Sequence, residues 1–470
     1  MKFSLLFIFA FLNAMIAESQ TAWDLQQCID YALKHNITLK QAALNSEISK
    51  NNTTQSKAAI APSLNMGAQH NYNFGQTIDR FTNTFANTQV LSQNFYVSSS
   101  VVLWSGLSQY NNVKANEYNY LSSLENTKQL QNDLSLNVAN AYISVIFAEE
   151  LLKISENQSS VTKEQLERTQ KLVNAGSIAK SIEYDIKAQL ANEQVNVTTA
   201  ENNLSISLLN LKQLMNLDSV TNFSIARPIL DVSENPLLAD NIQYIYESGL
   251  KNQPSIKRGE YSILSAEKSL AASKGRISPT LSFNASMGTG TSGLAKDILG
   301  VSYSGLQLSG ITNKGDSVYT PVTQLITRKT SFSDQFKNNV NKSLGFTLNF
   351  PLFNGLQTHT AIKNAKINAL NARFSQDLAK QNLYKTISQA YVSAKAALNK
   401  YAATKLSVEA ANESFKYAQQ KFDAGVISAF DFSTSKNRLF AAESNLLQAK
   451  YDYIFRLKVL DYYQGKPLGF

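Results

Sequence analysis

The side chains best suited to catalysis or metal binding are few and far apart in this sequence. The chain has 470 residues but only three histidines, His35, His70 and His359, and a single cysteine, Cys28. A metal site needs several such ligands at short, regular spacing, and one cysteine cannot form an intrachain disulfide. Residues 288–290 (Gly-Thr-Gly) lack the strand-to-helix setting of a phosphate-binding loop. We therefore predict no enzyme, no cofactor and no metal site, with Cys28 a small buried residue of the first helix.

The charged residues give no sign of nucleic-acid binding. The net charge is +9 and the isoelectric point is near 9.2, but lysines and arginines are scattered along the chain. A nucleic-acid-binding surface would gather them into a cluster, often with aromatic residues between them. We interpret the excess as solvated surface and predict no nucleic-acid partner.

The N-terminus predicts export from the cytoplasm. Lys2 precedes an apolar stretch at 3–16, and the small residues Ala17 and Ser19 follow it. This is the pattern of a secretory signal peptide, which we place at 1–17 with cleavage after Ala17 or Ser19. No later run of about 18 apolar residues predicts a transmembrane helix. We therefore expect a periplasmic, secreted or outer-membrane β-barrel protein.

The sequence contains an internal repeat. Residues 141–144 (Ala-Tyr-Ile-Ser) recur as 390–393 (Ala-Tyr-Val-Ser), which is 249 positions later. Residues 61–64 (Ala-Pro-Ser-Leu) resemble 278–281 (Ser-Pro-Thr-Leu), which is 217 positions later. Self-similarity over such long offsets indicates two copies of one structural plan. Each copy would read helix, strand, loop, strand, long helix, glycine, long helix.

The two offsets also locate an insertion in the second copy. They differ by 32 residues (249 − 217), which must lie between Pro279 and Gly355. Residues 288–316 are rich in glycine, serine and threonine, so we predict a long loop there. We assign the first repeat to 20–235 and the second to 236–470.

Four segments of about ten residues alternate apolar and polar side chains, as β-strands do. We predict strands at about 63–74, 95–104, 281–289 and 344–353. In the first two, the predicted apolar faces hold Leu64, Met66, Ala68, His70, Tyr72 and Phe74, and Phe95, Val97, Ser99, Val101 and Leu103. This alternation is typical of a membrane barrel around water, although a soluble β-sandwich shows it too. Four strands cannot close a barrel in lipid, so several protomers would have to share one.

The long helical segments carry a heptad pattern, which predicts coiled-coil packing. The apolar positions recur at alternating spacings of four and three: Leu134, Val138, Ala141, Val145, Ala148 and Leu152, then Leu383, Ile387, Ala390, Ala394, Ala397 and Tyr401, with Val408, Ala411, Phe415, Ala418 and Phe422. The segments 106–176 and 355–425 each span 70 positions, or roughly 105 Å if helical. Gly176 and Gly425 lie where each long helix should end and the chain reverse.

Three segments carry a resemblance to a known family. These are 23–33 (Trp-Asp-Leu-Gln-Gln-Cys-Ile-Asp-Tyr-Ala-Leu), 350–355 (Phe-Pro-Leu-Phe-Asn-Gly) and 421–431 (Lys-Phe-Asp-Ala-Gly-Val-Ile-Ser-Ala-Phe-Asp). Together with the duplication, they resemble the TolC family of outer-membrane efflux proteins. The resemblance implies a mainly α fold with a membrane β-barrel part. It also implies four strands per protomer and a 12-stranded barrel in a homotrimer.

The resemblance further implies a channel in the outer membrane of a Gram-negative cell, with a long periplasmic extension. Such a channel passively conducts drugs, small toxic compounds or metals. It contacts outer-membrane lipid and works with a periplasmic adaptor, which links it to an inner-membrane pump of RND or ABC type. An exit duct for peptides or proteins of type I secretion is an alternative within the same fold. A periplasmic coiled-coil adaptor or structural protein without a barrel is a third reading.

The resemblance also assigns the site residues. The periplasmic tip that docks the adaptor would comprise Gly176, Ser177, Ile178, Gly425, Val426 and Ile427. The entrance gate would comprise Phe422, Asp431 and Ile182. Isoleucines 182 and 427 occupy the acidic and basic places of the family's polar lock, and Phe422 lacks a hydroxyl. We therefore expect closure by packing around Phe422. Three copies of Asp431 would form a negative ring, unless this residue only caps the returning helix.

Overall fold

The structure is a computed structural model that describes residues 22–79, 81–86, 89–218, 223–228 and 241–466. The predicted signal peptide and the predicted repeat boundary at 235 lie outside these residues. The chain divides into two compact units, and each contains residues of both repeats. Unit 1 comprises Met1–Ser49, Tyr118–Leu264 and Leu370–Phe470, and unit 2 comprises Lys50–Glu117 and Ser265–Ala369.

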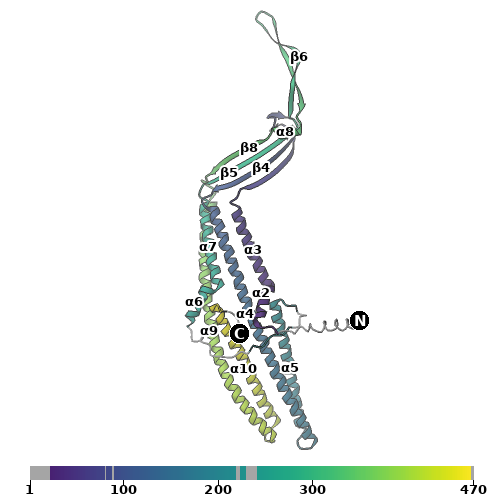
Figure 1. The fold of residues 1–470 in the computed structure, drawn as a ribbon, viewed down its shortest axis with the longest axis vertical. Coiled ribbons are helices and arrows are strands. Elements are labelled where there is room, and N and C mark those ends of the chain that lie inside the picture. The colour runs from purple at the N-terminus through teal and green to yellow at the C-terminus, as the bar shows by residue number, and fades with distance from the viewer. Residues whose placement is uncertain (1–21, 80, 87–88, 219–222, 229–240, 467–470) are drawn as a thin grey trace, which may run out of the picture. The chain divides into compact units, whose positions relative to one another are not determined.

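Eight helices of the described chain form four pairs of equal length, and Figure 1 labels them. They are α2 (Leu25–His35) and α6 (Ile242–Asn252), α3 (Ile37–Ala58) and α7 (Pro254–Gly275), α4 (Ser108–Asn174) and α9 (Gln357–Asp423), and α5 (Lys180–Met215) and α10 (Ala429–Gln464). The paired lengths are 11, 22, 67 and 36 residues. The start of α9 follows that of α4 by 249 positions (357 − 108), and α7 follows α3 by 217 (254 − 37). The two offsets found in the sequence therefore also relate the helix boundaries.

The core of unit 1 follows the heptad seam of the long helices. In each copy the first, second, fourth and fifth of the six seam positions are buried: Leu134, Val138, Val145 and Ala148 on α4, and Leu383, Ile387, Ala394 and Ala397 on α9. The seam repeats every seven residues, which keeps one stripe of each helix turned towards its neighbours. Because alanines occupy several of these positions, adjacent helices can pack closely.

Helix α2 joins this core through a well-defined start. The Asp24 carboxylate accepts the Gln27 backbone N–H (2.7 Å), and the Gln27 side chain accepts the Asp24 backbone N–H (3.0 Å). This capping box satisfies two backbone donors that the first turn would otherwise leave without partners. The buried side of α2 then carries Leu25, Cys28, Ile29 and Ala32.

Tyr142 joins two distant segments to α4. Its side chain is fully buried, and its hydroxyl lies 3.1 Å from the Trp23 carbonyl oxygen and 2.5 Å from that of Ala226. The backbones of residues 23 and 225 form a parallel bridge at the same place. Burial raises the pKa of this hydroxyl, so it remains a neutral donor to these carbonyls.

Unit 2 is built on one antiparallel sheet in the order β1-β4-β5-β8. Its strands are β1 (Ser63–Asn73), β4 (Val90–Trp104), β5 (Thr280–Ser292) and β8 (Asn341–Asn349). Strand β4 begins five residues before the predicted segment at 95–104 (95 − 90), and β8 ends before Phe350. A short pair, β2 (Thr77–Asp79) and β3 (Thr84–Ala86), lies in the connection between β1 and β4.

The register gives the sheet one apolar and one polar face. Leu64 pairs with Ser99, which pairs with Ala285 and then Leu344. On the opposite face, the Ser100 hydroxyl donates to the Asn284 side chain (2.8 Å), which donates to the Thr347 hydroxyl (3.1 Å). Paired residues of adjacent strands share a face, so the sheet separates a polar ladder from an apolar surface. The apolar side chains are strongly exposed at both edges: Leu64, Met66, Leu344 and Phe346.

One predicted strand position is wrong. The alternation placed Leu103 beside Val101 on the apolar face. In the structure the register shifts between Val102 and Trp104, and Trp104 pairs with Leu281. Leu103 is the extra residue of a β-bulge, which a period-two pattern cannot reveal.

The prediction of a long loop at 288–316 is also wrong. Strand β5 continues to Ser292, and the inserted residues form the hairpin β6 (Lys296–Ile311) and β7 (Ser317–Lys329), followed by helix α8 (Phe332–Asn338). Glycine and serine suggested a loop, but the inserted segment also carries regularly placed aliphatic and aromatic residues. The hairpin turns through residues 312–316, where Gly315 has a φ of +92°.

No helix in the described part of the chain is long and apolar enough to cross a membrane.

The environment of Cys28 generates a test of the α2 packing. Burial, and secondarily the charge of Asp24, raises the pKa of this thiol from 9.0 to about 12. The reactive thiolate is therefore nearly absent at pH 8, and the sulfur is shielded from reagents. We expect the native protein at pH 8 to resist a maleimide for hours and the urea-unfolded protein to react within minutes. Mass spectrometry measures the adduct, and rapid labelling of the native protein would contradict this packing.

Candidate functional site

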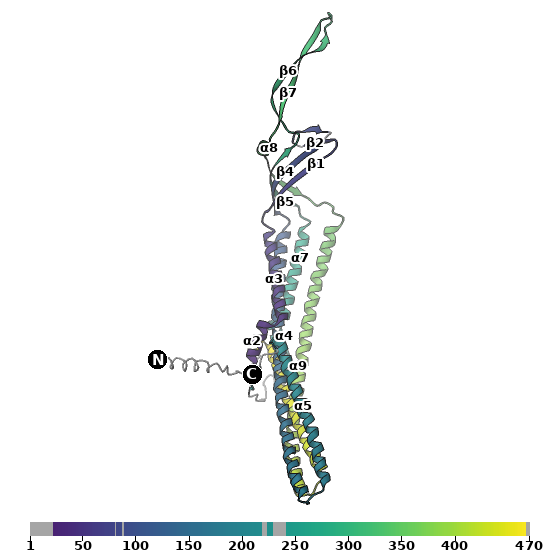
Figure 2. The same ribbon diagram turned by 90° about the vertical axis from the view of Figure 1, so that its right-hand side faces the viewer.

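The candidate site lies where each long helix of unit 1 reverses direction. Helix α4 ends at Asn174 and α5 begins at Lys180, while α9 ends at Asp423 and α10 begins at Ala429. Both turns lie at the same end of unit 1 in the two views of Figures 1 and 2. We call the residues of these two turns, 175–179 and 424–428, the tips.

The two tips share one backbone geometry. In the first, the Gly176 N–H donates to the Val173 carbonyl (2.9 Å) and the Ser177 N–H to the Leu172 carbonyl (2.9 Å). This pair of bonds defines a Schellman motif. The second tip repeats it, with Gly425 donating to Phe422 (3.0 Å) and Val426 to Lys421 (2.8 Å).

The backbone conformation, and not a lack of room for a side chain, explains why glycine occupies both tips. Their φ angles are +71° at Gly176 and +72° at Gly425, and a Cβ atom at either position would meet nothing within 4 Å. Only glycine adopts this left-handed conformation without steric cost. These residues therefore set where the helices end and leave the neighbouring side chains to form any contact surface.

The tips differ in how the returning helix begins. In α10 the Ser428 hydroxyl accepts the Asp431 N–H (3.2 Å), and the Asp431 carboxylate accepts the Ser428 N–H (3.4 Å) and hydroxyl (2.7 Å). The residue that precedes α5, Ala179, has no side chain that can cap the helix. Asp431 therefore belongs to a capping box as its third helical residue. Its side chain is also exposed.

Several predicted site residues surround one cavity between the hairpins. This cavity, of about 680 Å³, is lined on one side by Ile178 and Ile182 and on the other by Phe422, Gly425 and Ile427. Gly176, Ser177, Val426 and Asp431 do not line it. The structure thus brings together part of the predicted tip and part of the predicted gate, with apolar side chains facing each other.

Phe422 packs against its own hairpin. Its ring stacks on Phe432 of α10, with centroids 4.8 Å apart and planes 27° apart. Phe415 also lies against Phe432, at 5.6 Å. These contacts join α9 to α10 beside the tip, so the aromatic position holds this helix pair together in the single chain.

A polar link near the tip was missed from the sequence. The Arg168 guanidinium lies 2.8 Å from the Asp423 carboxylate and connects α4 to α9. Their side chains are 62% and 38% exposed, so water screens the attraction and its contribution to stability is small. Isoleucines 182 and 427 take no part in this link, so its positions differ from those of the family's polar lock.

A second missed feature is a buried ion pair further from the tips. Lys436 of α10 lies 3.2 Å from the Glu193 carboxylate of α5, and these side chains are only 7% and 2% exposed. The Lys436 ammonium also donates to the Gln158 carbonyl of α4 (2.7 Å) and to the Thr162 hydroxyl. Burial lowers the pKa of this lysine, and the charge of Glu193 opposes that shift.

The Glu193 carboxylate also accepts hydrogen bonds from two glutamine side chains. The Gln189 side-chain amide donates to it at 2.9 Å, and that of Gln158 lies 3.5 Å away. The cluster therefore joins three helices, α4, α5 and α10. A buried carboxylate loses its hydrogen bonds to water, and here an ammonium and amide donors replace them.

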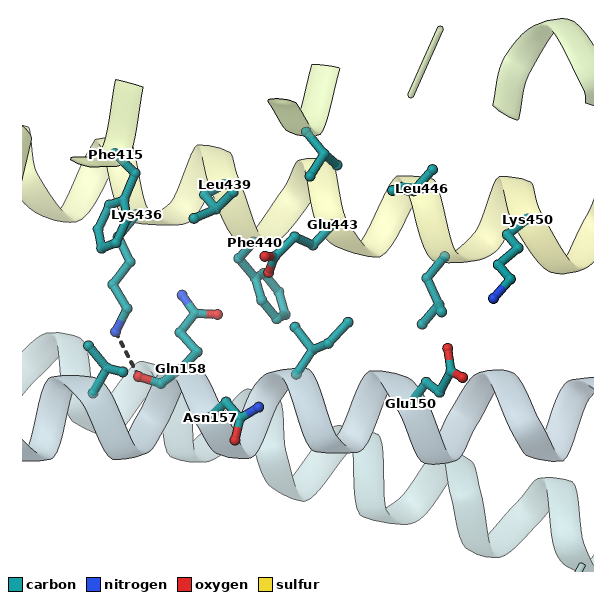
Figure 3. A pocket seen from close by; sticks show the side chains of 14 residues that line it. Glu150, Asn157, Gln158, Phe415, Lys436, Leu439, Phe440, Glu443, Leu446 and Lys450 are labelled. Atoms are coloured by element: carbon teal, nitrogen blue, oxygen red, sulfur yellow. Dashed lines mark hydrogen bonds between the residues drawn. The ribbon is translucent and has the colours of Figure 1, made fainter. Parts of the chain in front are cut away.

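The cluster borders a cavity of about 520 Å³ between α4, α9 and α10 (Figure 3). Lys436, Glu443 and Lys450 alternate along α10 with Leu439 and Leu446 at spacings of three and four. Burial raises the pKa of Glu443. Charged residues at this heptad spacing on α10 are the signal by which the cluster could have been found from the sequence.

No group of three or more His, Cys, Asp or Glu side chains in the described ranges could hold a metal ion.

Comparison with known proteins agrees with this architecture. The family model described as "Outer membrane efflux protein" matches residues 28–217 and 245–461. The outer membrane protein TolC of Escherichia coli (strain K12) is 22% identical over 444 residues, which are 92% of this chain and 80% of that protein. TolC of Vibrio cholerae is 23% identical, with 96% and 92% covered. The Campylobacter jejuni CmeC channel superposes with a TM-score of 0.75 at 16% identity, covering 95% of this chain and 86% of that one.

The duplicated helical hairpins and the two-faced sheet define a channel-type protein of mainly α structure with a β part. Because the family model matches most of the sequence, the chain belongs to the outer membrane efflux protein family. It is a TolC-family channel of the outer membrane and not an enzyme.

The buried ion pair generates a stability prediction. Lys436→Met would leave Glu193 as an uncompensated buried charge, and Glu193→Gln would do the same to the lysine. We expect each substitution to lower the free energy of unfolding by about 3–5 kcal/mol. The double variant should lose much less than the sum of the two.

Thermal unfolding of the detergent-purified protein, followed by helical circular dichroism, measures these differences. Lys450→Met, two heptads further along the same helix, serves as the control and should cost about 1 kcal/mol or less. Additive losses in the double variant would show that the two charges do not stabilise each other.

Proposed function

We propose that three copies of the chain close one 12-stranded barrel and conduct small toxic compounds, drugs or metals out of the cell. The observation that best supports this proposal is the open-edged four-stranded sheet. Strands β1 and β8 each have a single neighbour within the described residues, so the sheet has two edges. Unpaired backbone groups are too costly in hydrocarbon, and pairing of β8 with β1 of the next copy removes them.

The two faces of the sheet fit this barrel. The exposed apolar side chains at Leu64, Met66, Leu344 and Phe346 would contact outer-membrane lipid. The ladder of Ser100, Asn284 and Thr347 would line the water-filled interior. The coiled-coil helices would form the periplasmic extension, and the two structural repeats would each supply two strands and one hairpin.

We further propose that the tips dock a periplasmic adaptor, which couples the channel to an inner-membrane pump of RND or ABC type. TolC-family channels are trimers that work with such partners. The support in this chain is the exposure of apolar residues beside the second Schellman turn, where Val426 is 71% and Phe430 77% exposed. Exposed apolar groups at a helix turn are typical of a protein contact.

Efflux measurements test the function and the docking surface together. Cells lacking the gene should accumulate a fluorescent efflux substrate, and the wild-type gene should restore export. Val426→Asp should restore less than a tenth of the wild-type rate, because a carboxylate in an apolar interface loses its hydration.

Val426→Leu keeps the apolar surface and should restore export. Size-exclusion chromatography of both variants should show the same trimer. Unchanged accumulation on deletion would contradict small-molecule efflux, and comparison of secreted proteins would then test the type I secretion alternative.

The proposed entrance ring of Asp431 has its own test. Three carboxylates should favour cations, so Asp431→Asn should reduce the cation-to-anion permeability ratio in planar bilayers. Ser428→Ala is the matched control, because it also breaks the capping box but keeps the carboxylate. An equal loss of selectivity in both variants would show that Asp431 acts only by capping α10.

A further inference from the structure

The β6–β7 hairpin of unit 2 exposes more apolar surface than a free ribbon should. Figures 1 and 2 show it extending from the end of the sheet next to α8. A two-stranded ribbon alone in water is only marginally stable. Yet its side chains at Ile298, Val301, Tyr303, Leu306 and Ile311 are 59–68% exposed.

Three β-bulges gather these residues on one face. Strand β6 carries one extra residue at each of three register shifts, between Ile298 and Gly300, Tyr303 and Leu306, and Leu308 and Gly310. Each shift reverses the alternation along β6, while β7 alternates regularly. The residues of β6 opposite the odd-numbered positions 317–327 are therefore Ile298, Val301, Tyr303, Leu306, Leu308 and Ile311.

The other face of β6 is different in character. The β6 residues paired with even-numbered positions of β7 are Gly300, Ser302, Gln307 and Gly310. All large apolar side chains of β6 that are paired with β7 thus share one face, to which β7 adds Tyr319, Pro321 and Leu325. We call this the apolar face of the hairpin. The opposite face has fewer large apolar side chains, with Val318 and Ile326 of β7 opposite glycines of β6.

The ribbon also lacks charge along its length. Residues 298–313 and 317–327 contain no Asp, Glu, Lys, Arg or His. Copies of such a surface can meet without bringing like charges together. Depletion of charge with enrichment of apolar and aromatic groups is typical of the buried centre of an interface between identical subunits.

The base of the hairpin is held firmly to the sheet. The Gln335 side chain of α8 exchanges two hydrogen bonds with the Ser292 backbone (2.8 and 3.1 Å), and the Ser292 hydroxyl donates to the buried Asp79 carboxylate. The Thr289 hydroxyl donates to the Phe336 carbonyl (2.7 Å). These bonds fix where the ribbon leaves the sheet, so every copy would present it in the same place.

We propose that the apolar faces of three hairpins, one from each copy of this chain, pack together as a collar beyond the barrel. This inference rests on the trimer proposed above. The hairpin is inserted between β5 and the edge strand β8, and only the short helix α8 separates it from β8 along the chain, so barrel closure would place it beside the next copy. Continuity with that edge and the absence of charge both favour a second copy of this chain as the occupant.

Photocrosslinking in intact cells tests the collar. The amino acid p-benzoylphenylalanine replaces Tyr303 on the apolar face or, as the matched control, Gln307 on the opposite face. Denaturing gels should show products of two and three chain masses from position 303, at least tenfold more than from position 307. Restored efflux by both variants shows that they fold.

Crosslinking at a third position distinguishes failure of the collar from failure of the proposed trimer. Replacement of Thr347 on the edge strand β8 should give crosslinked chains if the barrel closes. Products from 347 but none from 303, equal products from 303 and 307, or adducts of 303 with another protein or lipopolysaccharide would each overturn the collar. Absence of chain-to-chain products at both 303 and 347 would overturn the trimer as well.

Discussion

The hydrogen-bonding groups at the two edges of the four-stranded sheet set the main constraint on this molecule. Within this sheet as the structure describes it, β4 and β5 have a neighbour on each side, whereas β1 and β8 have a neighbour on one side only. The apolar face of the sheet favours contact with lipid or with another apolar surface. In such surroundings water cannot bond to the backbone groups at the open edges. A single chain therefore cannot be the working unit if the sheet enters a membrane. Repetition of the chain around an axis is the simplest way to remove both edges, because each β8 meets a β1.

The helical unit solves a different physical problem with the same duplicated plan. Its seam of small and aliphatic residues allows close packing but specifies register weakly, because many alanine contacts are alike. The Lys436–Glu193 pair is specific where the seam is not, since the ammonium and the carboxylate, both buried, must meet at 3.2 Å. Buried polar groups of this kind are known to fix register in coiled coils at a cost in stability. We interpret the cluster as the position that aligns α5 and α10 on α4.

The repeat, the order of elements and the helix reversals could be predicted because each depends on a regular signal. Heptads, two-residue alternation and glycine at a left-handed turn are local rules that the chain obeys. The failures came from places where a single residue breaks the rule. Leu103 is a bulge, and the three bulges of β6 hide an apolar face from any period-two reading. Arg168 and Asp423 lie 255 positions apart, and no local pattern connects them.

The two helical hairpins, α4–α5 and α9–α10, share one plan but differ in the contacts that hold their helices together near the tips. The second has the Ser428–Asp431 capping box and the stack of Phe415, Phe422 and Phe432. At the offset of 249, the aromatic positions become Leu166, Val173 and Glu183 in the first hairpin, and α5 begins without a side-chain cap. Ring stacking and capping each contribute about 1 kcal/mol, so α9 and α10 are held to each other more firmly than α4 and α5. If the tips rearrange, the α9–α10 pair should move as one body, and the first hairpin should absorb the deformation.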